Sequence, residues 1–348
     1  MKEDARRKDV DIARFIAAIC IMIFHGNYYN VGYSKHHFYG AWIFVELFFM
    51  LTGYFTAMHF FNIKCPDDSD DAKESFFYVL KKLRPVYFFF FTALLLTYSF
   101  KFFIELRANG FKKIMLIDYF NGFLKESLLL YAPGYCSAYL NSAWYVSALF
   151  WTLPIIAYLL RKIKSEYTYI FSGFFSVVFY AKRGVLMRQG GLDDIFRAFA
   201  AISLGVFLYG ICKIIRDRGI VVKKIIQLPV LVVFLGNIFY YINGSSAQFE
   251  KTKNCLVLIF LFLCFILCQK DLIPSNIMDK PIFYLGKLSL PIYLYQLPAG
   301  IVASKFIGHY QLPKIWGGGL YIIVTILFSV FFDFLYTYLK RIKKCKEF

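Results

Sequence analysis

Long hydrophobic runs alternate with short polar stretches along the whole chain. About 20 apolar residues in an α-helix cross the ~30 Å hydrocarbon core of a bilayer. Runs of this length predict about ten transmembrane helices, and the pattern therefore predicts an all-α polytopic membrane protein. No polar segment is long enough for a soluble domain, so we expect one transmembrane domain over residues 9–340 and a basic tail over residues 341–348. The predicted spans are 12–30, 39–61, 85–104, 143–160, 166–181, 194–212, 225–242, 254–269, 281–301 and 317–339.

Composition and charge agree with this reading and add an orientation. Of the 348 residues, 59% are hydrophobic and 21% aromatic, and the mean hydropathy is +0.56, which excludes an ordinary soluble protein. Lys and Arg are more numerous in alternate connecting segments, beginning with the N-terminus, so both termini are predicted to be cytoplasmic. The predicted location is a cell membrane, inner or plasma. The formal net charge of +18 favours contact with anionic membrane lipids rather than nucleic acid, because the basic residues form no face interleaved with aromatics.

The first span carries two ionisable residues, Arg14 and His25. Eleven residues advance a helix by about 16 Å and return to nearly the same azimuth, so both side chains share one face. Ionisable groups at membrane depth are costly and normally face a protein interior or an aqueous cavity, which makes His25 a candidate functional residue. The structural alternative is a histidine that hydrogen-bonds between helices, with Arg14 as an interfacial anchor.

Glu46 in the second span is predicted to lie at a depth similar to that of His25. A carboxylate hydrogen-bonded to an imidazole fixes the tautomer of the ring, as in many general bases. We therefore consider a His25–Glu46 pair as a hypothesis that rests on depth alone.

Three basic residues, Lys81, Lys82 and Arg84, precede Pro85, which is predicted to start the third span. Anchoring at the cytoplasmic surface explains them fully. The alternative is that they hold the phosphates of a cytosolic cofactor, for which the bidentate guanidinium is suited.

Later spans hold further candidates. Trp144 and Tyr145 stand at the predicted outer end of the fourth span, where anchoring at the membrane–water interface is the simplest explanation for both. Arg197 is expected to reach the outer surface by snorkelling, and Gly205 in the same span is expected to permit close helix contact. Gln296 is a polar residue in a span that two prolines are expected to kink. The eight cysteines contain no CxxC pair, so neither a disulfide framework nor a zinc site is predicted, and no metal is expected.

Five stretches in this order resemble the membrane-bound acyltransferase type 3 family over nearly the whole chain. They are IARFIAAICIMIFHG, VELFFMLTGYF, KKLRPVY, SAWYVSALF and LGKLSLPIYLYQLP. Each motif is weak alone, but five in sequence on a ten-span frame are more specific.

The resemblance implies an enzyme that takes an acyl group from a cytosolic acyl-CoA, usually acetyl-CoA, and O-acylates a surface carbohydrate. The family's arginine and histidine match Arg14 and His25. Its basic pair before the third span matches Lys81 and Arg84, where the lysine is a departure, and a histidine frequent in the ninth span is Gln296 here. The chain resembles the stand-alone subgroup, without an esterase-like domain.

Acyl transfer from a thioester needs a base for the acceptor hydroxyl, stabilisation of the oxyanion and a site for the anionic donor. His25 is the predicted base with Glu46 as its partner, and Arg14, Lys81, Lys82 and Arg84 are the predicted CoA ligands. Trp144, Tyr145 and Gln296 are the candidate acceptor-binding residues. Two alternatives stay open: a transporter of polysaccharide or lipid-linked sugar, and a non-catalytic component of a polysaccharide assembly complex. The oligomeric state is not indicated.

Overall fold

The computed structural model describes residues 7–29, 31, 38–62, 71–135, 139–140, 142–163, 167–181, 191–220, 223–243, 249–269, 279–311 and 313–346. Within these residues the regular structure is helical throughout. The α-helices are α1 Lys8–Gly26, α2 Phe44–Asn62, α3 Asp71–Asn109, α4 Lys113–Ser127, α5 Ala143–Lys162, α6 Tyr167–Ala181, α8 Leu192–Asp217, α9 Lys224–Ile242, α10 Phe249–Cys268, α11 Asp279–Tyr310 and α12 Lys314–Lys346. Two 3-10 helices, Asn27–Tyr29 and Tyr39–Ile43, follow α1 and precede α2.

The helices coincide with the spans that the hydrophobic pattern predicts. Each predicted span overlaps one helix, and α4 is the additional helix among the described residues. Among the described residues, six segments, in α2, α3, α5, α8, α9 and α12, are long and apolar enough to cross a membrane, and α6 and α10 contain shorter apolar helices. The protein is therefore an all-α polytopic membrane protein. Ten crossings and cytoplasmic termini stay predictions.

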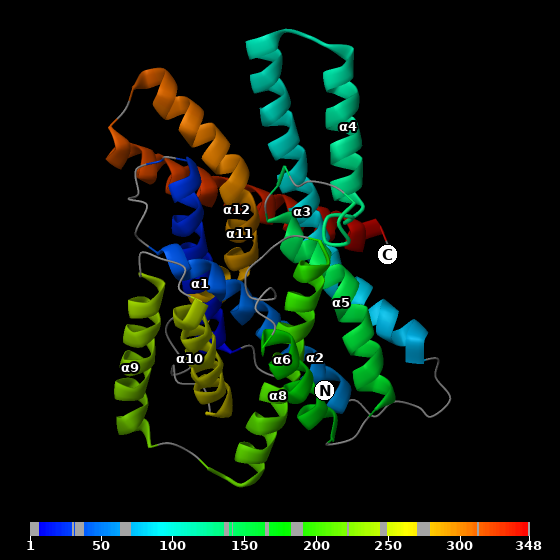
Figure 1. Cartoon of the computed structure of the whole chain (residues 1–348), viewed down its shortest axis with the longest axis vertical. Helices are drawn as coiled ribbons and strands as arrows, with labels where there is room; N and C mark the ends of the chain where they lie inside the picture. The colour runs from blue at the N-terminus through cyan, green and yellow to red at the C-terminus, as the bar shows by residue number, and fades with distance from the viewer. Residues whose placement is uncertain are drawn as a thin grey trace.

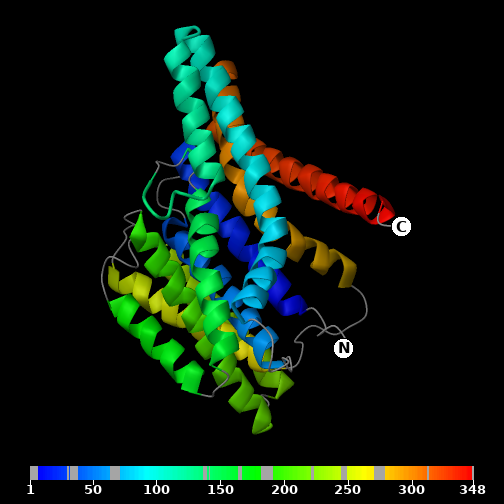
Figure 2. The same cartoon turned by 90° about the vertical axis from the view of Figure 1, so that its right-hand side faces the viewer.

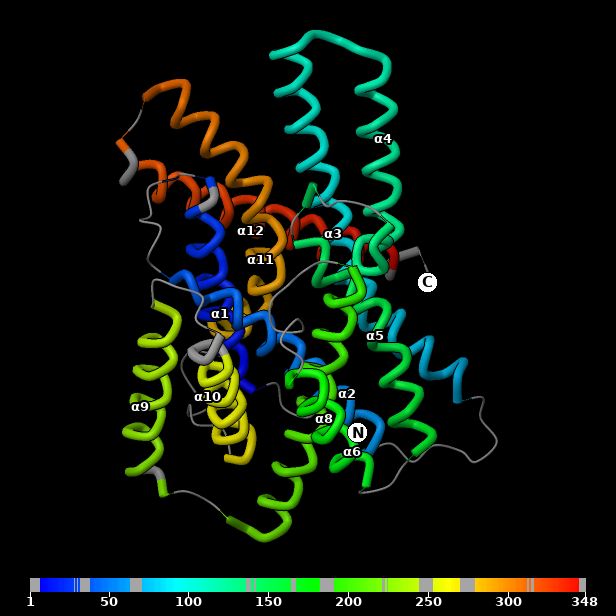
Figure 3. Tube along the Cα trace, viewed as in Figure 1, coloured from blue at the N-terminus to red at the C-terminus, as the bar shows by residue number. Residues whose placement is uncertain are grey.

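A bundle around α2 and α8 forms the body of the molecule (Figures 1 and 2). On one side of it, α1 packs along α11, and α11 packs in turn against α12 and α3. On the other side, α6 packs against α8, and α9 pairs with α10. The outer half of α3 and α4 extend from the bundle as a hairpin, which the tube view of Figure 3 shows clearly.

Two glycines bring the backbones of α2 and α8 into direct contact. A Cβ atom on Gly53 would overlap the carbonyl oxygen of Ile202, and one on Gly205 would overlap that of Met50. Small residues permit this kind of approach between transmembrane helices. The contact predicted for Gly205 is confirmed.

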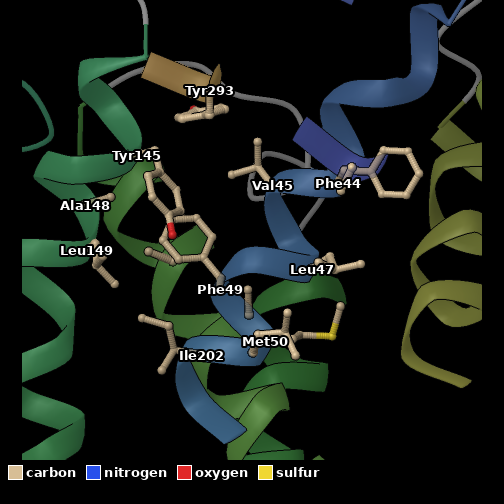
Figure 4. Close-up of a cluster of buried hydrophobic side chains, with 14 of the residues drawn as sticks. Phe44, Val45, Leu47, Phe49, Met50, Tyr145, Ala148, Leu149, Ile202 and Tyr293 are labelled. Carbon is tan, nitrogen blue, oxygen red and sulfur yellow. The ribbon is translucent and has the colours of Figure 1, made fainter. Parts of the chain in front are cut away.

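The main hydrophobic core lies where α2, α5, α8 and α11 meet (Figure 4). The ring of Phe49 packs on that of Tyr145 with centroids 4.6 Å apart, and Met50 of α2 and Ile202 of α8 belong to the same cluster of buried side chains. These side chains are almost inaccessible to solvent. The core therefore fixes the relative positions of the helices that carry the candidate residues.

Helix α3 begins at Asp71, so the prediction that Pro85 starts this helix is wrong. Arg161 of α5 is buried and binds both acidic residues of the first turn of α3, Asp71 at 2.6 Å and Glu74. This contact stabilises the helical turns before the proline, and the helix continues through Pro85. A proline removes one backbone hydrogen bond, which a long packed helix tolerates.

Helix α4 packs against α3 and completes a hairpin with it. Glu126 at the end of α4 is fully buried. Its carboxylate accepts hydrogen bonds from the Tyr98 hydroxyl at 2.8 Å, the Tyr139 backbone N–H at 2.5 Å and the Leu140 N–H at 3.3 Å. Through these hydrogen bonds the carboxyl links the base of the hairpin to the loop before α5. Burial raises the pKa of Glu126 despite the three donors.

Candidate functional site

A cavity of about 270 Å³ lies among α1, α2, α3, α5 and α11. It combines two cationic side chains with aromatic and aliphatic walls. Its lining consists of Arg14, Phe48, Thr52, Lys82, Leu83, Pro85, Val86, Tyr145, Leu149, Leu153, Leu290 and Tyr293. A predominantly apolar concave site with a few convergent polar groups is the usual form of a small-molecule site.

The charge in this cavity is positive. Lys82 donates from Nζ to Thr56 Oγ1 at 2.8 Å, and its further acceptors, the Tyr78 hydroxyl at 3.3 Å and the Thr52 carbonyl at 3.4 Å, are also neutral. Arg14 has Asp11 3.7 Å away on its own helix, but Asp11 is not part of the lining. Among the described lining residues there is no carboxylate, so the cavity is suited to an anionic group.

Aromatic rings form another part of the cavity wall. The centroids of Tyr145 and Tyr293 are 5.4 Å apart, and Phe48 lies 6.2 Å from Tyr293 and 6.5 Å from Tyr145. The Tyr145 side chain also hydrogen-bonds with Thr52, on the same helix as Phe48. Of the predicted acceptor-binding residues, Tyr145 is therefore the one that lines this cavity. Figure 4 shows Tyr145 and Tyr293 on facing elements.

His25 lies in the last turn of α1, on the face that Arg14 shares and about 16 Å further along the helix. It is partly buried and is not a lining residue of the cavity. Its ring is next to that of Phe24, with centroids 5.0 Å apart. The Arg14-to-His25 face of α1 thus leads from the cationic cavity toward the other end of the helix.

Helix α11 runs beside α1 in the same direction. Gly286 packs against Asp11, and Gly300 packs against the ring of Tyr29. This register places Gln296 at about the height of His25. Gln296 is fully buried and donates from its amide to the Tyr293 carbonyl at 2.8 Å, whereas its own side-chain oxygen has no hydrogen-bond partner among the described residues. A buried acceptor of this kind can receive a donor from a ligand.

Glu46 belongs to a second polar centre, near the N-terminal ends of α2 and α8. Its carboxylate is fully buried, accepts a hydrogen bond from the Tyr180 hydroxyl at 2.6 Å and forms an ion pair with Arg197. The predicted His25–Glu46 pair is not among the contacts that the structure describes for this carboxylate, and it stays a prediction. The described contacts instead give Glu46 the role of holding Arg197.

Arg197 does not snorkel to the surface, so that prediction is wrong. It is 2% exposed, and its guanidinium carbon lies 4.9 Å from the ring centroid of Trp42 and 4.8 Å from that of Trp144. Trp144 is itself buried against this cation rather than exposed at an interface. Two indole faces and one carboxylate thus replace the water that a charged group loses on burial.

The remaining predicted donor ligands, Lys81 and Arg84, are exposed on α3 and lie outside the cavity lining, whereas Arg14 and Lys82 are within it. Residue-type and spacing arguments missed Thr52 and Tyr293, which carry no charge to mark them. The Arg197–Glu46 contact could have been found, because two opposite charges at membrane depth in separate spans are expected to meet.

A separate apolar recess of about 150 Å³ lies among α1, α2, α9 and α10. Its lining is aliphatic and aromatic apart from Asp9, and the side chains of Leu231 and Leu235 belong to it. It has none of the cations of the first cavity, so it is suited to hydrocarbon rather than to an anion.

The fold is that of an integral membrane protein: an all-helical bundle with a cationic cavity suited to an anionic group and with ionisable residues along one helix face. A sequence model of one family, Acyl_transf_3, described as an acyltransferase domain, matches residues 7–334. The chain belongs to this family and is a membrane O-acyltransferase. Comparisons with curated proteins and with solved structures give no significant match.

Proposed function

We propose that this acyltransferase moves an acyl group, acetyl in the simplest case, from cytosolic acyl-CoA to a hydroxyl of an exported or surface polysaccharide. The observation that carries the proposal is the cavity in which Arg14 and Lys82 converge without a carboxylate in the described lining. The phosphate and thioester parts of acyl-CoA are anionic and polarisable, and both are stabilised by such cations. Lys81 and Arg84 are exposed on the same helix and are proposed to contact the nucleotide end.

The geometry of α1 supports a two-sided reaction. Arg14 and His25 share one face about 16 Å apart, which is comparable to the length of a pantetheine arm. A donor whose phosphates bind near Arg14 can therefore present its thioester toward His25. The acyl group then crosses much of the bilayer on the cofactor arm.

In the proposed reaction His25 is the general base. The acceptor hydroxyl oxygen attacks the carbonyl carbon of the thioester, the C–S bond breaks, and the imidazole takes the hydroxyl proton and passes it to the departing CoA thiolate. Gln296, at about the height of His25, is proposed to accept a hydrogen bond from the acceptor through its side-chain oxygen. Tyr145 is proposed to bind the acceptor or the acyl arm at the cavity wall. Trp144 does not line the cavity and is proposed to support it by packing against Tyr145, with ring centroids 6.4 Å apart.

The test is transfer of labelled acetyl from acetyl-CoA to surface glycan in membranes that contain the wild type or a variant at equal amounts. His25→Ala is expected to abolish transfer, and His309→Ala, a control near the end of α11, is expected to keep wild-type activity. Substantial transfer by His25→Ala would overturn its role as the base.

The donor site is tested separately by the kinetics of acetyl-CoA use. Lys82→Gln is expected to raise the KM for acetyl-CoA at least tenfold, since a charge-assisted contact is worth about 1.5–3 kcal/mol. Lys162→Gln, an exposed lysine at the end of α5, is the matched control. An unchanged KM for Lys82→Gln would overturn the assignment of the cavity to the donor.

A further inference from the structure

Three cysteines from two helices converge at one end of the bundle. Cys212 lies in the last turns of α8, and Cys264 and Cys268 lie one turn apart on α10. All pairs of their sulfur atoms lie within 4.8 Å, with Cys212 Sγ 3.1 Å from Cys268 Sγ and Cys264 Sγ 3.9 Å from Cys268 Sγ. The acyl-transfer proposal uses none of them.

The triangle of sulfur atoms has the size of a metal site. A point equidistant from the three atoms lies about 2.4 Å or less from each, close to the ~2.3 Å typical of bonds between metal ions and thiolate sulfur. The sulfur atoms already lie at this distance, so neither helix has to move for them to bind an ion at this point. The three groups are thus arranged for coordination by the packing of α8 against α10.

Two of the three cysteines are buried, and a positively charged side chain lies beside the cluster. Cys212 is fully buried and Cys268 nearly so, whereas Cys264 is partly buried. Arg216, one turn after Cys212, lies close enough to Cys212 and Cys268 to interact with them electrostatically and donates to the Tyr54 hydroxyl at 3.0 Å. A monovalent ion bound by three thiolates carries two negative charges, one of which this guanidinium offsets.

We propose that Cys212, Cys264 and Cys268 form a three-thiolate site for a soft metal ion, with copper(I) as the ion that fits it. Thiolate ligands select copper(I), zinc and iron–sulfur clusters. Structural zinc sites are almost always four-coordinate, and in the part of the chain that the structure describes no fourth histidine, cysteine or carboxylate joins this group. Copper(I) accepts three sulfur ligands, so the donor set favours it.

The predicted orientation places this cluster at the cytoplasmic end of α8 and α10, where thiols are kept reduced. Metal binding there would fasten α10 to α8. Arg7 already holds the same end of α10, with Nη1 donating to the carbonyls of Leu267 at 3.2 Å and Gln269 at 3.0 Å. The copper site would therefore add a second contact at the end of α10 that Arg7 already binds.

The experiment titrates copper(I) into the purified full-length protein under reducing, anaerobic conditions, against a chromophoric copper(I) chelator. All proteins carry serine in place of the three cysteines whose side chains lie outside the described residues, through Cys65→Ser, Cys136→Ser and Cys345→Ser. Cys264→Ser removes one ligand. Cys255→Ser is the control, because Cys255 is buried on the same helix but does not belong to the cluster.

The expected result is one copper(I) per chain with a shell of three sulfur atoms in X-ray absorption. Cys264→Ser is expected to weaken binding at least about tenfold, and copper is expected to raise the apparent melting temperature of the control but not of this variant. If Cys264→Ser does not fold, Cys268→Ser serves the same purpose. Equal copper affinity of ligand and control variants, retention of zinc in preference to copper(I), or a Cys212–Cys268 disulfide in the reduced preparation would each overturn the proposal.

Discussion

The buried ion pair between Glu46 and Arg197 provides the sharpest test of the fold. Glu46→Gln removes one charge and keeps the shape, and the amide oxygen can still accept the hydrogen bond from Tyr180. Because Glu46 is fully buried and Arg197 is 2% exposed, the variant removes the described carboxylate partner of a buried cation. Breaking a buried pair in this way costs about 3–5 kcal/mol. The two indole rings on Arg197 retain part of the stabilisation, so we expect about 3 kcal/mol.

The assay is reversible unfolding of the purified protein by sodium dodecyl sulfate in mixed micelles, followed by tryptophan fluorescence. A loss of about 3 kcal/mol corresponds to a more than hundredfold shift in the unfolding equilibrium. Asp217→Asn, at the exposed end of α8, is the control and is expected to change stability by less than about 0.5 kcal/mol.

A double-mutant cycle separates the pair from its surroundings. Arg197→Gln alone leaves Glu46 buried with Tyr180 as its remaining described partner, whereas Glu46→Gln combined with Arg197→Gln leaves neither member of the pair charged. The double variant is therefore expected to lose less stability than the sum of the two single variants. Additive losses, or a loss below about 1 kcal/mol for Glu46→Gln, would refute the account of the pair as a mutually compensated buried contact.

Two further predictions concern the α2–α8 contact and the buried carboxyl of Glu126. Gly205→Ala places a methyl group against the Met50 backbone and is expected to destabilise the fold by about 1–3 kcal/mol. The control Gly236→Ala, with no atom near its Cβ position, is expected to be neutral or slightly stabilising. Equal unfolding midpoints of the two variants would contradict this prediction. Because burial raises the pKa of Glu126 above its usual 4.5, its contribution to stability is complete below that value and is lost as pH rises through the folded-state pKa. Glu126→Gln is expected to flatten this part of the profile of unfolding midpoint against pH, and a variant with the wild-type slope would exclude Glu126 as its source.

The spans and the fold class could be predicted from the sequence because the bilayer imposes a length and an apolar composition on each helix. The same constraint does not predict where α3 begins. The acidic residues Asp71 and Glu74 lie outside the apolar run, yet they form the first turn of the helix and bind Arg161. Tertiary contacts determine where this helix begins, and no local signal in the chain shows which residue will bind Asp71 and Glu74.

The candidate site was predictable in part. Arg14 and Lys82 were found from charge and position, and they do line one cavity. Depth, however, fixes the height of a residue and leaves its azimuth open, which is why Arg197 was assigned to the surface although it binds Glu46. The cysteine cluster illustrates the same limit: the spacing of Cys264 and Cys268 puts them on one helix face, but only the packing of α8 brings Cys212 to them.

The backbone contact between α2 and α8 also bears on how molecules reach the interior. At Gly53 and Gly205 there is no room for a methyl group, still less for a hydrocarbon chain, so this seam is closed to lateral passage from the bilayer. In the described part of the chain, the apolar recess bounded by α1, α2, α9 and α10 differs from this contact, because it offers about 150 Å³ of space with a mainly hydrocarbon lining. A hydrocarbon chain is therefore accommodated by the recess beside α9 and α10 and not at the α2–α8 contact.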